Sequence, residues 1–186
     1  MPPGLGYPPA VPSIRGIFSA AGVALAATLL GSPDRPSWPL TLRDGLPAAL
    51  PGYAAAPRDP LPDTDENEMG IYTEVSRFFQ RIESATSTRQ FRLVVQDYGR
   101  GKDLEAALRK AFSQASVAPS VETREVKLGA FPAFAVTDRS GPRPTTLVTV
   151  IVTPSRLVLG QGANVDWEEA LKLVRLVDLE KVAGAR

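Results

Sequence analysis

One uncharged apolar run near the N-terminus constrains this chain more than any other feature of its sequence. The run extends from Gly16 to Leu30, follows Arg15 directly, and ends before Gly31-Ser32-Pro33. As a helix its fifteen residues rise about 22 Å, which is shorter than the hydrocarbon core of roughly 30 Å. We expect residues 14–32 to form a short transmembrane anchor that contacts membrane lipid, and two other interpretations stay open.

The first alternative is a cleaved secretory signal, for which the length of the run is suitable. Its weak points are an n-region whose only side-chain charge is Arg15, and a cleavage site, Ala24-Leu25-Ala26, that leaves only about eight apolar residues. The second alternative is a buried helix of a soluble protein. If the segment is an anchor, the charges on its flanks favour a single-pass protein of the inner (cytoplasmic) membrane. The N-terminus is then cytoplasmic and the C-terminal domain periplasmic. A cleaved signal would instead release the domain into the periplasm.

The positions of the 18 prolines divide the chain into regions. Five prolines lie in residues 1–12, eight in residues 33–62, and five in residues 63–186. Because proline fixes φ and lacks a backbone N–H, dense proline resists both helix and sheet. We therefore expect a Pro-rich tail at 1–13, an extended linker at 33–62, and an α+β extracytoplasmic domain at 63–186.

Charge and composition exclude several classes of function. Residues 33–186 carry 20 basic and 20 acidic side chains without a basic stripe, which argues against nucleic-acid binding. The chain contains neither Cys nor His, so disulfides, thiolate nucleophiles, imidazole ligands and a Ser-His-Asp triad are impossible. We therefore expect no cofactor and no enzyme activity.

Small residues recur along the apolar run at helical spacing. Gly16, Ala20, Ala24 and Ala27 lie three or four residues apart, which lets a neighbouring transmembrane helix approach closely. Generic signal-peptide composition explains the same residues equally well. In the linker, Trp38 is a candidate for the membrane interface or for packing on the domain. The apolar stretch that ends at Tyr53 is expected to lie against the domain or a neighbouring protein.

The segment from Asp63 to Glu74 resembles a calcium loop in part. Asp63, Asp65, Asn67 and Glu74 match positions 1, 3, 5 and 12 of an EF-hand loop. However, Glu68 occupies position 6, where the sharp turn requires Gly. A solvated acidic loop is therefore the preferred interpretation, and no metal site is predicted.

The remaining sequence predicts alternating strands and two amphipathic helices. Residues 71–82 fit either a helix or a strand, and we interpret them with 91–98 as a hairpin. Further strands are predicted at 121–128, 133–139, 145–153 and 156–160, and helices at 103–116 and 166–177. The expected fold is an α+β sandwich in which an antiparallel sheet of about 5–6 strands carries both helices on one face.

This order of elements, β-β-α-β-β-β-β-α over roughly residues 70–183, resembles that of the PsbP/Mog1-like domains. That fold is used by extrinsic proteins of photosynthetic membranes and by small binding proteins. The pieces Leu46-Pro-Ala-Ala-Leu-Pro-Gly-Tyr53 and Leu176-Val-Asp-Leu179 also look like pieces of uncharacterised extracytoplasmic bacterial proteins. The resemblance is one of element order, so it carries over no functional residue.

Two functions of different class remain. The first is a non-catalytic, membrane-anchored accessory subunit of an integral membrane protein complex, photosynthetic or respiratory. The resemblance to PsbP-like domains slightly favours a photosynthetic complex. The second is a secreted or anchored periplasmic binding module for a small apolar ligand or an envelope component.

Overall fold

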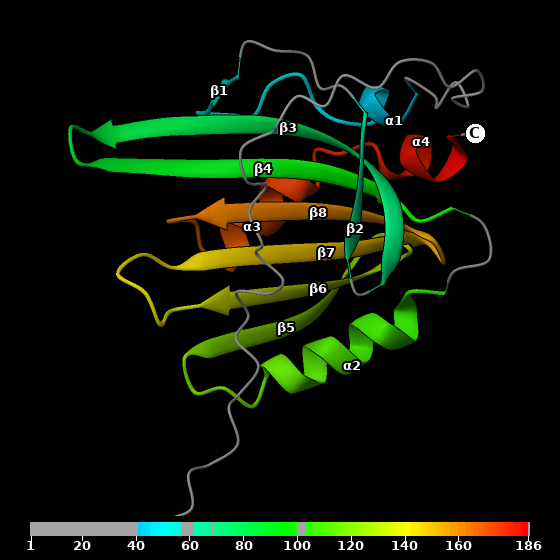
Figure 1. Ribbon diagram of the computed structural model, residues 1–186. Coiled ribbons are helices and arrows are strands. Elements are labelled where there is room, and N and C mark those ends of the chain that lie inside the picture. Colours follow the sequence, from blue (N-terminus) through cyan, green and yellow to red (C-terminus); the bar gives the residue numbers. More distant parts are fainter. Residues whose placement is uncertain (1–40, 57–61, 68, 100–102, 186) are drawn as a thin grey trace, which may run out of the picture. The chain divides into compact units, whose positions relative to one another are not determined.

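Eight antiparallel strands form one sheet in the computed structural model, which describes residues 41–56, 62–67, 69–99 and 103–185. The fold is therefore α+β, as predicted. The strands follow one another in the order β1-β3-β4-β8-β7-β6-β5, and β2 pairs with β3 outside this path (Figure 1). The elements in chain order are α1 (Thr41–Asp44), β1 (Ala54–Ala55), β2 (Asp63–Asn67), β3 (Gly70–Ser84), β4 (Ser87–Asp97), α2 (Glu105–Ala115), β5 (Val121–Leu128), β6 (Phe131–Asp138), β7 (Thr145–Thr153), β8 (Arg156–Ala163), α3 (Trp167–Val174) and α4 (Leu179–Gly184).

Residues 71–82, whose sequence fits either a helix or a strand, belong to the long strand β3. It pairs with β4 from Thr73↔Asp97 to Ser84↔Ser87, so the expected hairpin is present. Val75 and Phe79 are almost fully buried, whereas Phe78 and Ile82 are exposed. This alternation by two residues is the strand period and rules out a helix, which would place Phe78 and Phe79 on adjoining faces.

The helices cover opposite faces of the sheet, and the expectation of two helices on one face is wrong. Leu108 and Phe112 of α2 pack on a cluster that includes Val94 and Phe134. Leu171 and Val174 of α3 pack on the other cluster, which is built on the opposite face. Figure 1 accordingly shows α3 behind the sheet and β2 in front of it. We call these the α2 face and the α3 face.

The physical reason is that the central strands are apolar on both sides. In β4, Leu93 and Val95 point to the α3 face, whereas Val94 points to the α2 face, and all three are buried. β8 shows the same arrangement, with Val158 on one face and Leu157 on the other. A layer of helices on one face would leave the other face in water, so each face requires its own cover.

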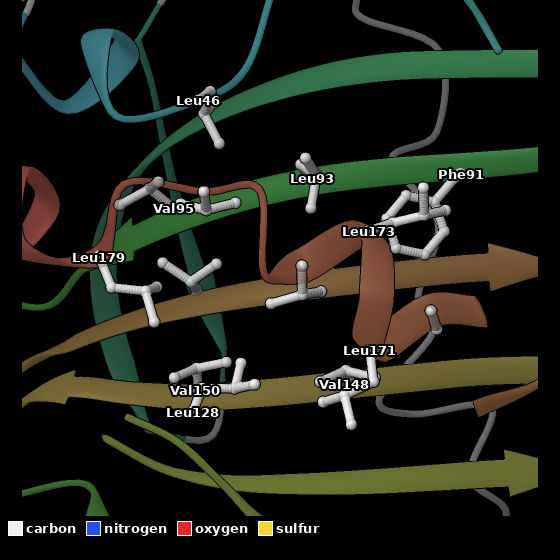
Figure 2. Close-up of a cluster of buried hydrophobic side chains, with 14 of the residues drawn as sticks. Leu46, Phe91, Leu93, Val95, Leu128, Val148, Val150, Leu171, Leu173 and Leu179 are labelled. Atoms are coloured by element: carbon white, nitrogen blue, oxygen red, sulfur yellow. The ribbon is translucent and has the colours of Figure 1, made fainter. Parts of the chain in front are cut away.

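The main core lies on the α3 face. Figure 2 shows Phe91, Leu93 and Val95 of β4 with side chains of β7, α3 and the start of α4. Helix α3 begins where the Asp166 carboxylate accepts a hydrogen bond from the Glu169 backbone N–H at 2.8 Å, so Asp166 is the N-cap of the helix. The helix comes so close to β8 that a Cβ on Gly160 would lie 2.3 Å from Val174 Cγ2.

Part of the Pro-rich linker belongs to this core. Leu42, Leu46, Leu50 and Tyr53 are buried and join the same cluster. Arg77 of β3 fixes the segment by donating a hydrogen bond to the Pro47 carbonyl at 2.6 Å. We call residues 41–56 the N-terminal arm. The folded unit therefore includes residues well before 63, where the sequence placed its start.

Two strands are present that the sequence did not predict, which explains why the sheet exceeds 5–6 strands. β1 lies in the arm, and β2 lies in the segment interpreted as an acidic loop. Both pair with β3 through backbone hydrogen bonds, and their side chains are mostly exposed. Exposed strands held by their backbone carry no apolar alternation, so the sequence pattern gives no signal for them.

None of the helices among the described residues has the length and apolar character needed to cross a membrane. The predicted membrane segment, 14–32, lies outside the described residues, as do the tail 1–13 and the first part of the linker. These assignments therefore stay predictions.

Candidate functional site

A group of exposed, uncharged side chains lies on the α2 face where β1, β3 and β4 run side by side. The register pairs Ala54 with Gln80 and Gln80 with Gln90, so these residues share a face. Phe78 is 47% exposed and Ile82 is 71% exposed, although both are large and apolar. We define the hairpin patch as Ala54, Ala56, Phe78, Gln80, Ile82 and Gln90, all of which are exposed.

The charges of this end of the hairpin all lie on its other face. Arg81, Glu83 and Arg89 are the only charged residues between Phe78 and Gln90. Glu83 pairs with the Arg81 Nη2 at 2.9 Å and with the Arg89 Nε at 2.8 Å. The two faces of the same strands thus differ sharply, one being an ion-pair network and the other uncharged.

Glu169 of α3 connects this network to the N-terminal arm. Its carboxylate accepts a hydrogen bond from the Tyr53 hydroxyl at 2.9 Å and pairs with Arg81 at 3.4 Å and with Arg89. The Arg81 guanidinium also lies over the Tyr53 ring, 5.3 Å from its centroid. One carboxylate therefore holds together the arm, the hairpin and helix α3.

A second polar network lies beside the patch on the α2 face. Arg92, whose guanidinium is 6.0 Å from the Phe78 ring centroid, pairs with Glu74 and donates to the Ser76 hydroxyl at 3.0 Å. Gln96 donates from Nε2 to Glu74 at 3.2 Å. The charge of Arg92 is thus compensated within the protein, and the hairpin patch borders on a neutral pair.

The same network fixes β2 across the α2 face. The Tyr98 hydroxyl donates to Gln96 Oε1 at 3.2 Å and accepts from Asn67 Nδ2 at 2.7 Å. Burial raises the pKa of Tyr98, and the charge of Glu74 raises it further. Burial also raises the pKa of Tyr72, and the charges of Glu74 and Asp65 raise it further. Both phenols are therefore protonated at neutral pH and act as hydrogen-bond donors.

The structure places Tyr53, which the sequence indicated as an interface residue, inside the core. It is 8% exposed, and its hydroxyl is bound to Glu169. Burial raises its pKa, and so does the hydrogen bond to Glu169. Tyr53 therefore contacts the domain itself, which is the first of the two alternatives that the sequence left open.

The four residues considered for calcium do not form an EF-hand loop, because Asp63–Asn67 is a strand paired with Gly70–Glu74. Asp65 accepts from the Tyr72 hydroxyl at 3.3 Å, Asn67 binds Tyr98, and Glu74 pairs with Arg92. In the described part of the chain, no three acidic side chains gather closely enough to hold a metal ion. The interpretation as a solvated acidic loop is also wrong, since the segment is a hairpin.

The remaining predicted site residues are not tested. Gly16, Ala20, Ala24 and Ala27, proposed for helix packing, and Trp38, proposed for the interface, lie outside the described residues. The hairpin patch was not predicted, although a signal for it exists. Once β3 is a strand, its apolar residues fall on both faces, so Phe78 and Ile82 cannot share a core with Val75 and Phe79.

Comparison with protein-family models, with curated proteins and with solved structures finds no match for this chain. The resemblance to PsbP/Mog1-like domains therefore stays a prediction.

Proposed function

We propose that this chain is a non-catalytic accessory subunit of an integral membrane protein complex. Residues 14–32 anchor it in the inner membrane with the N-terminus in the cytoplasm, and the domain lies in the periplasm. The partner complex is photosynthetic or respiratory. The lack of Cys and His in the sequence supports a non-catalytic role.

The observation that carries this proposal is the packing of the N-terminal arm. The arm is the chain's route from the apolar run to the domain, and Leu42, Leu46 and Leu50 are buried in the core. Only eight residues separate Ser32 from Thr41, and eight residues of chain span at most about 28 Å. A domain on so short a tether stays close to the bilayer, where its partners are other membrane proteins.

The experiment replaces residues 14–32 with a cleaved signal sequence and follows the protein in native membranes. We expect the unmodified chain to stay in the membrane fraction and to migrate with a large complex on a native gel. The released domain should appear in the periplasm and lose most of this co-migration. Free migration of the unmodified chain would contradict the proposal.

A second candidate, a module for a small apolar ligand, is favoured by the open part of the α2 face. Next to the hairpin patch, Leu147 and Val136 are only half-buried, and Gln161 lies beside Arg92. This candidate is tested by native mass spectrometry of the unit Pro36–Arg186, purified from the periplasm of the cells that naturally produce the protein. A stoichiometric bound lipid or other apolar molecule would favour it over the accessory subunit.

A further inference from the structure

We propose that the hairpin patch is the surface by which this domain docks on its partner. The occupant is an uncharged segment of an integral membrane protein, located just outside the bilayer. This inference rests on the proposed function and adds the surface and the chemistry of the partner.

The first argument is that the patch is an exception within its own sheet. The opposite edge strand, β5, carries Glu122, Arg124, Glu125 and Lys127, as is usual for an edge that must not pair with other proteins. The end of the β3–β4 hairpin instead turns Phe78 and Ile82 to the solvent. In Figure 1 this end reaches beyond β8, and β4 is paired with β8 only from Gln90 onward.

The second argument concerns charge. The three charged residues of this hairpin end, Arg81, Glu83 and Arg89, all lie on the α3 face, where each arginine pairs with both Glu83 and Glu169. The patch therefore offers no counter-charge, so a partner that buried an ion there would pay the full cost of its desolvation. Depletion of charge is also typical of the buried centre of protein interfaces.

The third argument concerns hydrogen bonding. Gln80 and Gln90 are directly opposite each other on β3 and β4, and both are exposed. Each amide offers donors and an acceptor, which suits the N–H and C=O groups of a partner backbone. An apolar loop or extended segment with free backbone groups fits such a surface, because Phe78 and Ile82 flank the amides with apolar contact area.

The fourth argument is that the surface is held in place before binding. Arg81 and Arg89, which alternate with the patch residues, are bound by Glu169 from behind. A preorganised surface loses less conformational freedom on association. The short tether then confines the patch to the region near the bilayer, where the extramembrane segments of integral membrane proteins are found.

The test compares Ile82→Lys with Ile71→Lys in the full-length chain in native membranes. Ile71 is the matched control, because it is 63% exposed on the same strand but lies outside the patch. We expect Ile82→Lys to lower the fraction that co-migrates with the complex about thirtyfold, the smallest effect expected of an interface hot spot. Ile71→Lys should leave the fraction unchanged, and both proteins should have the same Tm.

Gln90→Glu, which introduces a charge without adding bulk, should weaken co-migration in the same direction. A photo-crosslinking phenylalanine at position 82 should attach to an uncharged extramembrane segment of an integral membrane protein, identified by mass spectrometry. Equal co-migration of the Ile82 and Ile71 variants would overturn the docking surface while leaving the accessory-subunit proposal intact. If the unmodified chain itself runs free, the proposed function fails instead. A crosslink to a charged segment or to a soluble protein would also overturn the inference.

Discussion

At the scale of single residues, Glu169 of α3 connects parts of the chain that are far apart in the sequence. It binds Tyr53, Arg81 and Arg89 on three different parts of the chain. Its sequence neighbour Glu168 is exposed, so the two carboxylates form a natural comparison. The sequence predicted only that Glu169 belongs to the helix at 166–177.

We predict that Glu169→Gln lowers the free energy of unfolding by about 1–2 kcal/mol, because hydrogen bonds to a partly buried charge are lost. Amide hydrogen exchange should rise in the arm near Tyr53 and in the hairpin near Arg81 and Arg89. Glu168→Gln should change neither quantity. If both variants behaved alike, the carboxylate of Glu169 would not connect these elements.

Gly160 tests how closely α3 packs on the sheet. Alanine there would place its Cβ 2.3 Å from Val174 Cγ2 and 2.9 Å from Phe91 Cζ. We expect Gly160→Ala to destabilise the protein by about 1–3 kcal/mol in urea unfolding, as overpacking does. Gly184→Ala is the control, since no atom lies within 4 Å of its added Cβ. Equal midpoints for the two variants would contradict the close contact.

The buried phenols predict a dependence of stability on alkaline pH. Burial raises the pKa of Tyr53, Tyr72 and Tyr98 above the ordinary value of 10.0. The unfolded chain ionises these groups near that value, so their contribution to stability is complete below pH 10 and is lost as pH rises further. Tyrosinate absorbance should therefore show three of the four tyrosines ionising only at higher pH or with unfolding. Ionisation of all four at the ordinary value would contradict their burial.

At the scale of elements, the N-terminal arm is the least obvious part of the fold. Leu46 is 5% exposed and lies against the sheet, whereas Leu176 is 45% exposed. We expect Leu46→Ala to cost about 2–5 kcal/mol in chemical unfolding and Leu176→Ala to stay within about 0.5 kcal/mol. Similar values for the two would place the arm outside the core.

The extent of the folded unit gives a second prediction at this scale. The fragment Pro36–Arg186 should unfold cooperatively, because it contains Leu42, Leu46, Leu50 and Tyr53. A fragment that begins at Asp63 leaves their contacts on β3 and α4 open to water, so its Tm should fall strongly or its transition should disappear. Equal Tm values would show that the arm is dispensable.

These elements show what the sequence can and cannot reveal. The β4, β7 and β8 strands were predictable because they are short apolar runs rich in strand-favouring residues and bounded by turn residues. Both longer helices were predictable because their apolar residues repeat with the helical period. The arm was not, because its Leu42, Leu46 and Leu50 lie among prolines that indicate an extended linker. The sequence also does not show which face of the sheet each helix covers, since Val94 and Val95 make both sides of β4 apolar.

The candidate site was less predictable than the fold. Phe78 and Ile82 look like core residues until the register of β3 is known, because apolar residues are assigned to the core by default. The sequence indicated Tyr53 as a contact residue but not its partner, Glu169, which lies 116 residues away in the sequence. Such pairings depend on the topology of the sheet, which local patterns do not contain.

At the scale of the whole molecule, three parts of the chain act together: the apolar run, the N-terminal arm that packs into the core, and the domain that carries the hairpin patch. The run is the predicted anchor, the arm keeps the tether short, and the hairpin patch is the proposed docking surface. A different variant tests each of these parts, so the role assigned to each can be contradicted separately.

The most direct test is the intact mass of the protein taken from native membranes after gentle solubilisation and separation on a native gel. We expect a large complex in which the chain retains residues 14–32, together with integral membrane proteins that co-migrate. A chain that runs alone and begins after the apolar run would contradict the account, because the segment would then be a cleaved signal and the domain a free periplasmic protein.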